Sequence, residues 1–552
     1  MLSSLELPRA YALKSRNIFT MDPARPRAQA VAVVDGRIVA VGSAEEAAAA
    51  LPDGAPVIDL GDRMVLPGFT DSHIHLGYLA RKWNAVDLDG CSSLQEALER
   101  VAAYVAARAG ASDAWIDGHG WAAQRWAQRP TAAALDAVTG NRPAALTAKD
   151  GHALWVNSAA LQAAGITRDT ADPPGGIIER DPATGEPTGV LYEAATRLVL
   201  DVMPDLDIET LAGAVRAGLP RLHAQGITAV HCPELTSDWR AYWTLRQREQ
   251  LTLRVTFLPR AEQLEHLLAL GLVSGFGDRW LRLGQLKFFA DGTLGSRTAA
   301  MLEPFAGEPD NMGVLVLGGE ALRDPVTRAA AGGIASAIHA IGDRGVREAL
   351  DAVEHARRTV ERERPAAGAL RHRIEHAQLV HPQDMDRFAR LGVVASMQPA
   401  HGAVDRPNAL RAWGERVAYA SPYRSLRDRG VVLAFGSDAP FGLDLSDASF
   451  SVLNGIYAAM TRRWPADGGG AAPPDDYAPH EVLRLEEALE AYTAGPAFAG
   501  GEDAWRGRLR PGYCADIVVL EENLFAVAVA DIPHVPVALT IVDGRIVYRR
   551  EA

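Results

Sequence analysis

The fold depends most on one stretch, residues 65–76, which has the sequence Val-Leu-Pro-Gly-Phe-Thr-Asp-Ser-His-Ile-His-Leu. An apolar run leads into a Pro-Gly turn signal and ends in His73 and His75, which are separated by one residue. In a β-strand, residues i and i+2 project to the same face, so both imidazoles would leave the end of one strand together. Two imidazoles placed in this way can bind one metal ion. The alternative is a pair of strand-end histidines without a metal, and the rest of the chain decides between the two.

Apolar runs of strand length recur along the chain, with helical patterns between them. After residues 64–70, they lie at 226–232, 253–258, 281–289, 334–339, 371–376, 393–397 and 431–436. Strands that alternate with helices eight times predict an α/β fold in the form of a (β/α)8 TIM barrel. This rhythm alone leaves a doubly wound open sheet as the alternative.

The two ends of the chain carry similar hairpin signals. Apolar runs flank Asp35-Gly36 near one end and Asp543-Gly544 near the other. We therefore expect residues 1–64 and 499–552 to form one small β-sandwich beside a barrel at 65–498. Two independent hairpins are the alternative.

Two further segments depart from the strand–helix rhythm. Residues from about 80 to 205 mix helical runs with Gly/Pro-rich turns, which predicts an insertion after the first barrel strand. Residues 466–479 are rich in Gly, Pro and Asp, which predicts either a loop over the barrel mouth or a plain surface loop.

The composition narrows the class of protein. The 552 residues include 56 Lys and Arg against 69 Asp and Glu, and the resulting net charge of −13 argues against a nucleic-acid or anionic membrane partner. No stretch approaches the roughly 20 apolar residues of a membrane span. The cysteines Cys91, Cys232 and Cys514 are far apart, which fits a reducing compartment. We therefore expect a cytoplasmic protein, and the net charge says little about a small-molecule substrate.

More polar residues occur at the predicted strand ends, where barrel enzymes place their chemistry. Lys287 lies in the fourth strand, His339 and His376 end the fifth and sixth, and Asp438 follows the eighth. A lone strand-end histidine is most often structural, but these residues together with His73 and His75 predict a site for one or two divalent metal ions. Imidazole and carboxylate ligands suit Zn²⁺ first, and also Fe, Mn or Co.

These motifs resemble those of the amidohydrolase superfamily, in particular its amidohydrolase-3, YtcJ-like branch, which includes N-substituted formamide deformylases. The resemblance extends from about residue 15 to the C-terminus. The matching motifs are PGFTDSHIH at 67–75, GHGW at 118–121, DGH at 150–152, WVNS at 155–158, KFFADG at 287–292, TA at 298–299, HAIGD at 339–343, IEH at 374–376 and GSD at 436–438.

The resemblance implies a barrel with a β-sandwich from both chain ends, and it implies roles for the metal ligands. His73, His75 and Asp438 would hold the more buried metal, and His339 and His376 the other. Lys287 would be an N6-carboxylysine, whose anionic carbamate bridges the two metals. A bridge from Cys232 and a mononuclear site stay open. So does an ordinary ion pair of Lys287, for example with Asp291.

The resemblance also implies an activity. The expected reaction is the hydrolysis of a non-peptide C–N bond, such as that of an N-substituted formamide, by attack of a metal-bound hydroxide. Asp438 would accept the hydroxide proton and pass it to the leaving nitrogen. His152, Arg344 and Trp121 would contact the substrate, although each has an ordinary structural or solvated role as its alternative.

Other functions stay open at this stage. They are an esterase, lactonase or phosphotriesterase, a metal-assisted isomerase or decarboxylase, and a barrel protein that binds without catalysis. Homodimerisation is an expectation from the family alone.

Overall fold

The computed structural model describes residues 7–108, 115–123, 126–360, 370–443, 445–465 and 477–551. Most of the loop predicted at 466–479 lies outside them. The chain divides into two compact units, each treated separately below. The main unit consists of Met1–Leu76 and Arg216–Ala552, and the inserted unit is Gly77–Val215.

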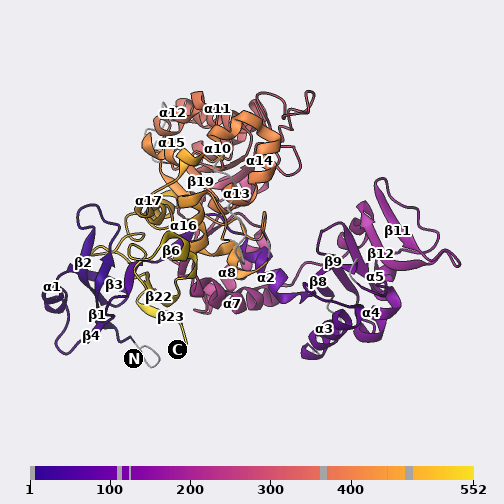
Figure 1. Cartoon of the computed structure of the whole chain (residues 1–552), viewed down its shortest axis with the longest axis horizontal. Coiled ribbons are helices and arrows are strands. Elements are labelled where there is room, and N and C mark those ends of the chain that lie inside the picture. The colour runs from indigo at the N-terminus through magenta and orange to yellow at the C-terminus, as the bar shows by residue number, and fades with distance from the viewer. Residues whose placement is uncertain are drawn as a thin grey trace. The chain divides into compact units, whose positions relative to one another are not determined.

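Strands from both chain ends share one sheet in the main unit (Figure 1). Its order is β23-β22-β21-β5-β1-β2-β3, and β4 pairs with β1. The strands are β1 (Ala10–Phe19), β2 (Arg27–Val34), β3 (Arg37–Gly42), β4 (Val57–Asp59), β5 (Met64–Pro67), β21 (Ile517–Leu520), β22 (Val537–Val542) and β23 (Arg545–Arg549). Both predicted hairpins are therefore present, as β2–β3 and β22–β23.

The alternation of side chains explains how this terminal sheet is packed. Val31 and Val33 belong to one apolar cluster with Leu539 of β22, whereas Ala30 and Ala32 face a second cluster. Successive residues of a strand point to opposite faces, so the valines bury one face and the alanines the other. The small alanine side chains leave room for helix α1 (Ala44–Ala49), which packs on β1–β3.

Parallel strands form the rest of the main unit. One sheet has the order β15-β14-β13-β6, and another has the order β16-β17-β18-β19-β20. The strands are β6 (Phe69–Asp71), β13 (Ile227–Cys232), β14 (Arg254–Phe257), β15 (Leu281–Leu283), β16 (Leu286–Phe289), β17 (Ser336–Ala340), β18 (Arg373–His376), β19 (Val394–Met397) and β20 (Leu433–Phe435). The predicted parallel strands are thus present in an α/β arrangement, except that the first, predicted at 64–70, is divided between β5 of the terminal sheet and β6 of the parallel sheet.

The strand predicted at 281–289 is wrong in one respect, because it is broken into β15 and β16. At the break, the Gly284 N–H donates to Phe257 O, and a Cβ at this position would lie 2.7 Å from Thr256. The Gln285 side chain donates to Ala499 O. β15 therefore pairs with β14, and β16 pairs with β17.

Helices alternate with these strands. Helices α10, α11, α12 and α15 pack in succession beside β17–β20 (Figure 1). The helices of this part are α7 (Ile208–Ala224), α8 (Thr236–Gln247), α9 (Leu264–Ala269), α10 (Glu320–Ala331), α11 (Asp343–Val360), α12 (Pro382–Arg390), α13 (Pro399–Val404), α14 (Arg406–Trp413), α15 (Tyr423–Asp428), α16 (Val452–Thr461), α17 (Leu485–Ala491) and α18 (Ala494–Ala499). α11 shows the reason for this packing, since Val346, Ala349, Leu350 and Val353 recur at helical spacing and are all buried.

The inserted unit has its own sheet, in the order β11-β12-β10-β9-β8-β7. Its strands are β7 (Val86–Asp87), β8 (Ile116–Trp121), β9 (Ala144–Ala148), β10 (Ala153–Val156), β11 (Gly176–Arg180) and β12 (Pro187–Glu193). Its helices are α2 (Leu76–Asn84), α3 (Leu94–Ala107), α4 (Ala132–Thr139), α5 (Ser158–Ala163) and α6 (Arg197–Leu200). Trp121, Trp126 and Trp155 pack together in its core, with ring centroids 6.1–6.3 Å apart.

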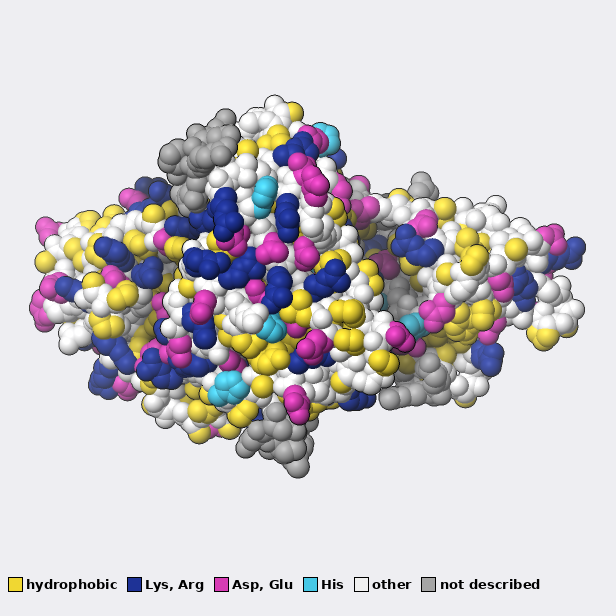
Figure 2. Space-filling view, turned by 90° about the horizontal axis from the view of Figure 1, so that it is seen from above, with side chains coloured by type: hydrophobic (Ala, Val, Ile, Leu, Met, Phe, Trp, Pro, Cys, Tyr) yellow, Lys and Arg dark blue, Asp and Glu magenta, His cyan; other side chains and the backbone are white. Residues whose placement is uncertain are grey.

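Basic and acidic side chains lie intermixed on the face seen in Figure 2. Ion pairs such as Arg429–Asp386 at 2.7 Å and Arg427–Glu490 at 3.0 Å join neighbouring elements. Among the residues that the structure describes, no helix combines the length and the apolar character needed to cross a membrane.

Buried His223 predicts an acid sensitivity of the fold. Its Nδ1 lies 3.0 Å from Ile227 O, its Nε2 lies 2.9 Å from Thr252 Oγ1, and burial lowers its pKa to about 4. An unfolded histidine keeps a pKa near 6.5, so unfolding takes up a proton between pH 6.5 and 4. His223 therefore makes its full contribution to the free energy of unfolding above pH 6.5. This contribution falls by about 2 kcal/mol between pH 7 and pH 5. Urea unfolding at the two pH values measures this loss.

The variant His223→Asn is the control, because its side chain does not titrate in this range. It should be less stable at both pH values, and its loss between pH 7 and pH 5 should be smaller than that of the parent protein. Equal losses in the two proteins would contradict the assignment to His223.

Candidate metal centre

The structure places five of the six predicted ligands at or beyond the carboxyl ends of parallel strands in the main unit, and Lys287 within β16. They are His73 and His75 after β6, Lys287 in β16, His339 in β17, His376 at the end of β18 and Asp438 after β20. His73, His376 and Asp438 are buried, and each offers a ligand atom within 4.8 Å of the other two. These three residues form the centre of the site.

The remaining histidines lie around this centre. His75 Nε2 is 3.0 Å from Asp438 Oδ1, and His73 Nε2 is 3.5 Å from the same oxygen. The ring centroids of His339 and His376 are 4.5 Å apart, and those of His73 and His376 are 5.1 Å apart. His73, His75 and His376 therefore lie within 3.9 Å of the Asp438 carboxylate, and His339 lies beside His376.

Glu375 orients His73, and the sequence reasoning assigned it no role. Glu375 Oε2 accepts from His73 Nδ1 at 2.5 Å, and its other oxygen accepts from Arg373 Nε at 2.5 Å. Burial opposes ionisation, yet the Arg373 guanidinium and His73 hold the pKa of Glu375 well below its ordinary value. The ionised carboxylate fixes the His73 proton on Nδ1 and leaves Nε2 for a metal.

His376 and His339 are oriented in a similar way. His376 Nδ1 lies 2.8 Å from Gln398 Oε1, and His339 Nε2 lies 3.0 Å from Gly292 O. Each acceptor oxygen fixes one ring proton, so the other ring nitrogen keeps its lone pair. Gln398 is a second residue whose role the sequence did not reveal.

The electrostatics favour neutral imidazoles beside an ionised carboxylate. Burial, followed by the charge of Lys287, lowers the pKa of His73 and of His339 to about 4. Burial raises the pKa of Asp438, but His73, His75 and His376 outweigh it and hold the pKa well below its ordinary value. Neutral imidazole and carboxylate are the forms that bind metal ions.

Lys287 is the predicted bridging ligand. Its side chain is buried, and its charge acts on His73, His339 and His376. Burial lowers its pKa to about 8, against the attraction of Glu375 and Asp438. Asp291, the ion-pair partner weighed as an alternative, accepts the backbone N–H groups of residues 300, 341 and 342.

The backbone is strained at two of the candidate ligands. His376 has φ = 71° and Asp438 has φ = 59°, in the left-handed region that residues other than glycine seldom adopt. Buried Asp71 supports this region, because its Oδ1 accepts the N–H groups of His73 and Ser437, each at 3.0 Å. Such strain persists where the surrounding contacts fix it, and it concentrates at functional sites.

Cys232, weighed as an alternative bridge, lies on the wrong face of its strand. Its thiol interacts with Tyr242 of α8 and lies near Glu234. The neighbouring His231 points to the opposite face, where its Nδ1 accepts from Arg373 Nη1 at 2.8 Å. Because adjacent residues alternate along a strand, the inward position belongs to His231.

The predicted substrate residues belong to both units of the chain. Trp121 and His152 lie in the inserted unit, where both line a cavity of about 260 Å³. Trp121 Nε1 donates to Leu146 O at 2.7 Å, and His152 pairs with Glu193 at 3.0 Å. Arg344 lies in the main unit with an exposed side chain, in the first turn of α11.

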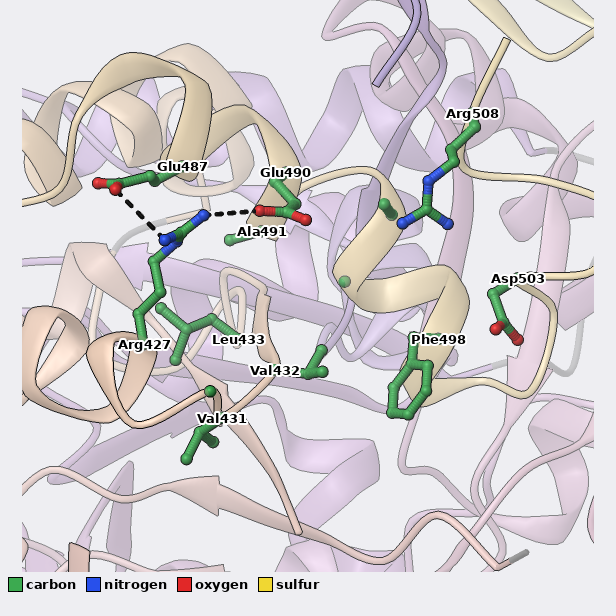
Figure 3. A pocket seen from close by; sticks show the side chains of 13 residues that line it. Arg427, Val431, Val432, Leu433, Glu487, Glu490, Ala491, Phe498, Asp503 and Arg508 are labelled. Carbon is green, nitrogen blue, oxygen red and sulfur yellow. Dashed lines mark hydrogen bonds and ion pairs between the residues drawn. The ribbon is translucent and has the colours of Figure 1, made fainter. Parts of the chain in front are cut away.

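A separate cavity of about 320 Å³ in the main unit has none of the six candidate ligands in its lining (Figure 3). It is lined by Val431 and Val432, which precede β20, and by Phe498 and Arg508. Asp438 follows the other end of β20, so this cavity is on the opposite side from the six candidate ligands.

The donor set fits a divalent metal such as zinc. Three buried residues supply nitrogen and carboxylate oxygen, and His73 has the carboxylate contact that is typical of metal-binding histidines. The fit rests on these side chains alone.

Comparisons with known proteins agree with this geometry. Residues 56–548 match the model of the "Amidohydrolase family". The chain is 32% identical over 546 residues to the putative amidohydrolase YtcJ of Bacillus subtilis, covering 97% of this chain and 98% of that protein. It is 30% identical over 552 residues to the N-substituted formamide deformylase of Arthrobacter pascens, covering 97% of each.

Solved structures show the same likeness. The crystal structure of an uncharacterized metal-dependent hydrolase from Pyrococcus furiosus has a TM-score of 0.76 and 27% identity, over 93% of this chain and 99% of that one. The crystal structure of an uncharacterized metal-dependent hydrolase from Pyrococcus horikoshii has a TM-score of 0.76 and 26% identity, over 94% of this chain and 99% of that one.

Proposed function

This chain belongs to the amidohydrolase family, and from that premise we propose that it is a metal-dependent hydrolase of a non-peptide C–N bond. The single observation that carries the proposal is the buried group of His73, His376 and Asp438. The N-substituted formamide deformylase among its relatives favours a small amide, such as an N-substituted formamide, as the substrate.

The side chains divide the work in this proposal. His73, His75 and Asp438 would hold one metal ion, and His339 and His376 a second. A divalent ion bound there would lower the pKa of water and polarise the substrate carbonyl. Asp438 Oδ1 would take up the proton of the attacking water and return it to the leaving nitrogen. Glu375 would keep His73 Nε2 directed at the ion.

Lys287 would supply the negative charge that two neighbouring cations need. We propose that its neutral amine adds to CO2 and releases one proton to the solvent, which forms a carbamate, an anionic oxygen ligand. Its burial and its lowered pKa of about 8 support this role, because only the neutral amine can react.

We also propose that the parallel strands form a (β/α)8 barrel, in which β15 and β16 are two parts of the fourth strand. Hydrogen bonds at both joins support this closure, from Lys287 N to Pro259 O at 2.8 Å and from Ser72 N to Phe435 O at 3.0 Å. The terminal sheet would be the predicted β-sandwich of both ends. The predicted domains keep their bounds, which are residues 1–64, 65–498 and 499–552. Homodimerisation stays a prediction. The cytoplasmic location also stays a prediction.

Removal of the metal tests the proposed function. We expect the purified protein to hydrolyse an N-alkyl formamide, with release of formate and amine in equal amounts. Chelation should lower the rate at least about 100-fold, because the site then lacks its Lewis acid, and added Zn²⁺ should restore it.

Two comparison substrates are used. One is the formate ester with the same alkyl group as the N-alkyl formamide, and the other is a dipeptide. Faster hydrolysis of the ester than of the amide would favour the esterase alternative. A rate that is unchanged by chelation would contradict the metal-dependent mechanism, and no turnover of any substrate at full metal content would favour a binding protein.

A further inference from the structure

A second cavity of the main unit has an unusual balance of charge. It has a volume of about 490 Å³, and Arg282 of β15 lines it together with the loop that precedes this strand. Trp505 and Asp543 contribute from the C-terminal part of the chain. Lys287 follows Arg282 by five positions in the sequence. Lys287 lies where the candidate metal ligands gather. We call this space the Arg282 cavity.

Two neighbouring arginines, Arg246 in the cavity wall and Arg254 beside it, are matched by carboxylates. Arg246 Nε lies 2.6 Å from Asp278. Arg254 contacts Asp516 at 2.6 Å and Asp543 at 3.0 Å. The positive charges of these two residues are therefore compensated within the protein.

Arg282 has much weaker compensation. Its nearest carboxylate, Glu502, is 3.7 Å away, and Glu502 also binds Arg506 Nε at 2.7 Å. Arg282 Nε is buried and has no hydrogen-bond partner among the described residues, and Nη2 reaches Gly275 O only at 3.4 Å. The described residues therefore do not fill the hydrogen-bonding capacity of this guanidinium.

Aromatic surface lies beside this guanidinium. Trp280 and Trp505 both line the cavity, and the Arg282 Cζ lies 5.9 Å from the Trp505 ring centroid. Indole rings stack on planar groups, and an arginine fork binds a carboxylate through two parallel hydrogen bonds. The carboxylates of Asp278 and Asp543 in the wall disfavour a ligand with two negative charges.

We propose that the Arg282 cavity binds a small aromatic carboxylate, with its carboxylate on Arg282 and its ring against Trp280 and Trp505. This site is separate from the candidate metal centre and goes beyond the proposed hydrolase function.

Calorimetric titration of the full-length protein with benzoate tests the proposal. We expect one benzoate site whose affinity is at least about tenfold weaker in Arg282→Gln, because a charged hydrogen bond is lost. The variant Arg508→Gln is the matched control, since Arg508 is a partly buried arginine that lines the cavity of about 320 Å³ described above (Figure 3). It should bind benzoate as the parent does.

A second variant keeps the test decisive if Arg282→Gln does not fold. Arg279 is exposed at the rim of the Arg282 cavity, so Arg279→Glu should fold normally and weaken benzoate binding by at least about threefold through charge repulsion. Undiminished binding in Arg279→Glu would contradict the proposal.

Two comparisons separate this site from the metal centre and from a general anion site. Benzoate binding should survive chelation of the metal, whereas binding that is lost on chelation and retained in Arg282→Gln would place benzoate on the metal and overturn the proposal. Cyclohexanecarboxylate should bind more weakly than benzoate. Inorganic phosphate that binds as tightly as benzoate would overturn the preference for an aromatic monoanion.

Discussion

Asp438→Asn should lower turnover by about 10²–10⁴-fold while the protein stays folded. The asparagine amide has nearly the size of the carboxylate, and its oxygen can still contact His75 Nε2, which lies 3.0 Å from Asp438 Oδ1. It can also remain a weak metal ligand, so the variant should keep much of its metal. What it cannot do is accept a proton. Steady-state kinetics on the best amide substrate, with metal analysis of the same sample, measures both effects.

A distant aspartate provides the control for this result. Asp384 of α12 is also buried and pairs with Arg347 and Arg387, so Asp384→Asn should lose stability but not turnover per folded molecule. Turnover near the parent rate in Asp438→Asn would rule out the proton-transfer role. Loss of turnover together with all metal would restrict Asp438 to the role of a ligand.

Lys287→Ala should reduce the metal content from about two ions per chain to one or fewer, and should abolish most turnover. The reason is electrostatic, since two cations held by neutral imidazoles repel each other unless an anion lies between them. The variant also removes a buried side chain whose charge acts on three of the histidines. Metal analysis of purified protein, before and after added Zn²⁺, gives the stoichiometry.

Added acetate provides a second readout for the same variant. A small carboxylate can enter the space that the alanine leaves and supply the missing negative charge, so acetate should partly restore metal binding and turnover. The exposed Lys14, which pairs with Asp59, gives the control variant Lys14→Ala with unchanged metal content. Unchanged metal content in Lys287→Ala would mean a structural lysine and a mononuclear site.

The sequence was most informative where chemistry follows from strand geometry. The spacing of His73 and His75, and the ends of the runs that carry His339 and His376, predicted side chains that the structure does bring together. Their positions depend only on the alternation of a strand and on the common direction of parallel strands, and both are local properties of the chain.

The contacts that orient these ligands could not be predicted in the same way. Gln398 reaches His376 from the segment after β19, and Asp71 joins the end of β6 to Ser437 beyond β20. These contacts depend on how separate strands are placed side by side. The position of Cys232 could not be predicted for the same reason. A shift of its strand by one residue would turn Cys232 inward in place of His231.

The pairing of the chain ends bears on how the protein is synthesised. In the terminal sheet, Pro67 of β5 pairs with Ile517 of β21, which the ribosome adds 450 residues later. At ordinary elongation rates this delay is roughly 20–90 seconds. During this delay β21 is absent. The edge of β5 and the apolar side chains of Val65 and Leu66 therefore lack the strand that covers them in the finished protein. Newly made chains of this protein should therefore depend on chaperones, and premature termination before β21 should yield aggregates.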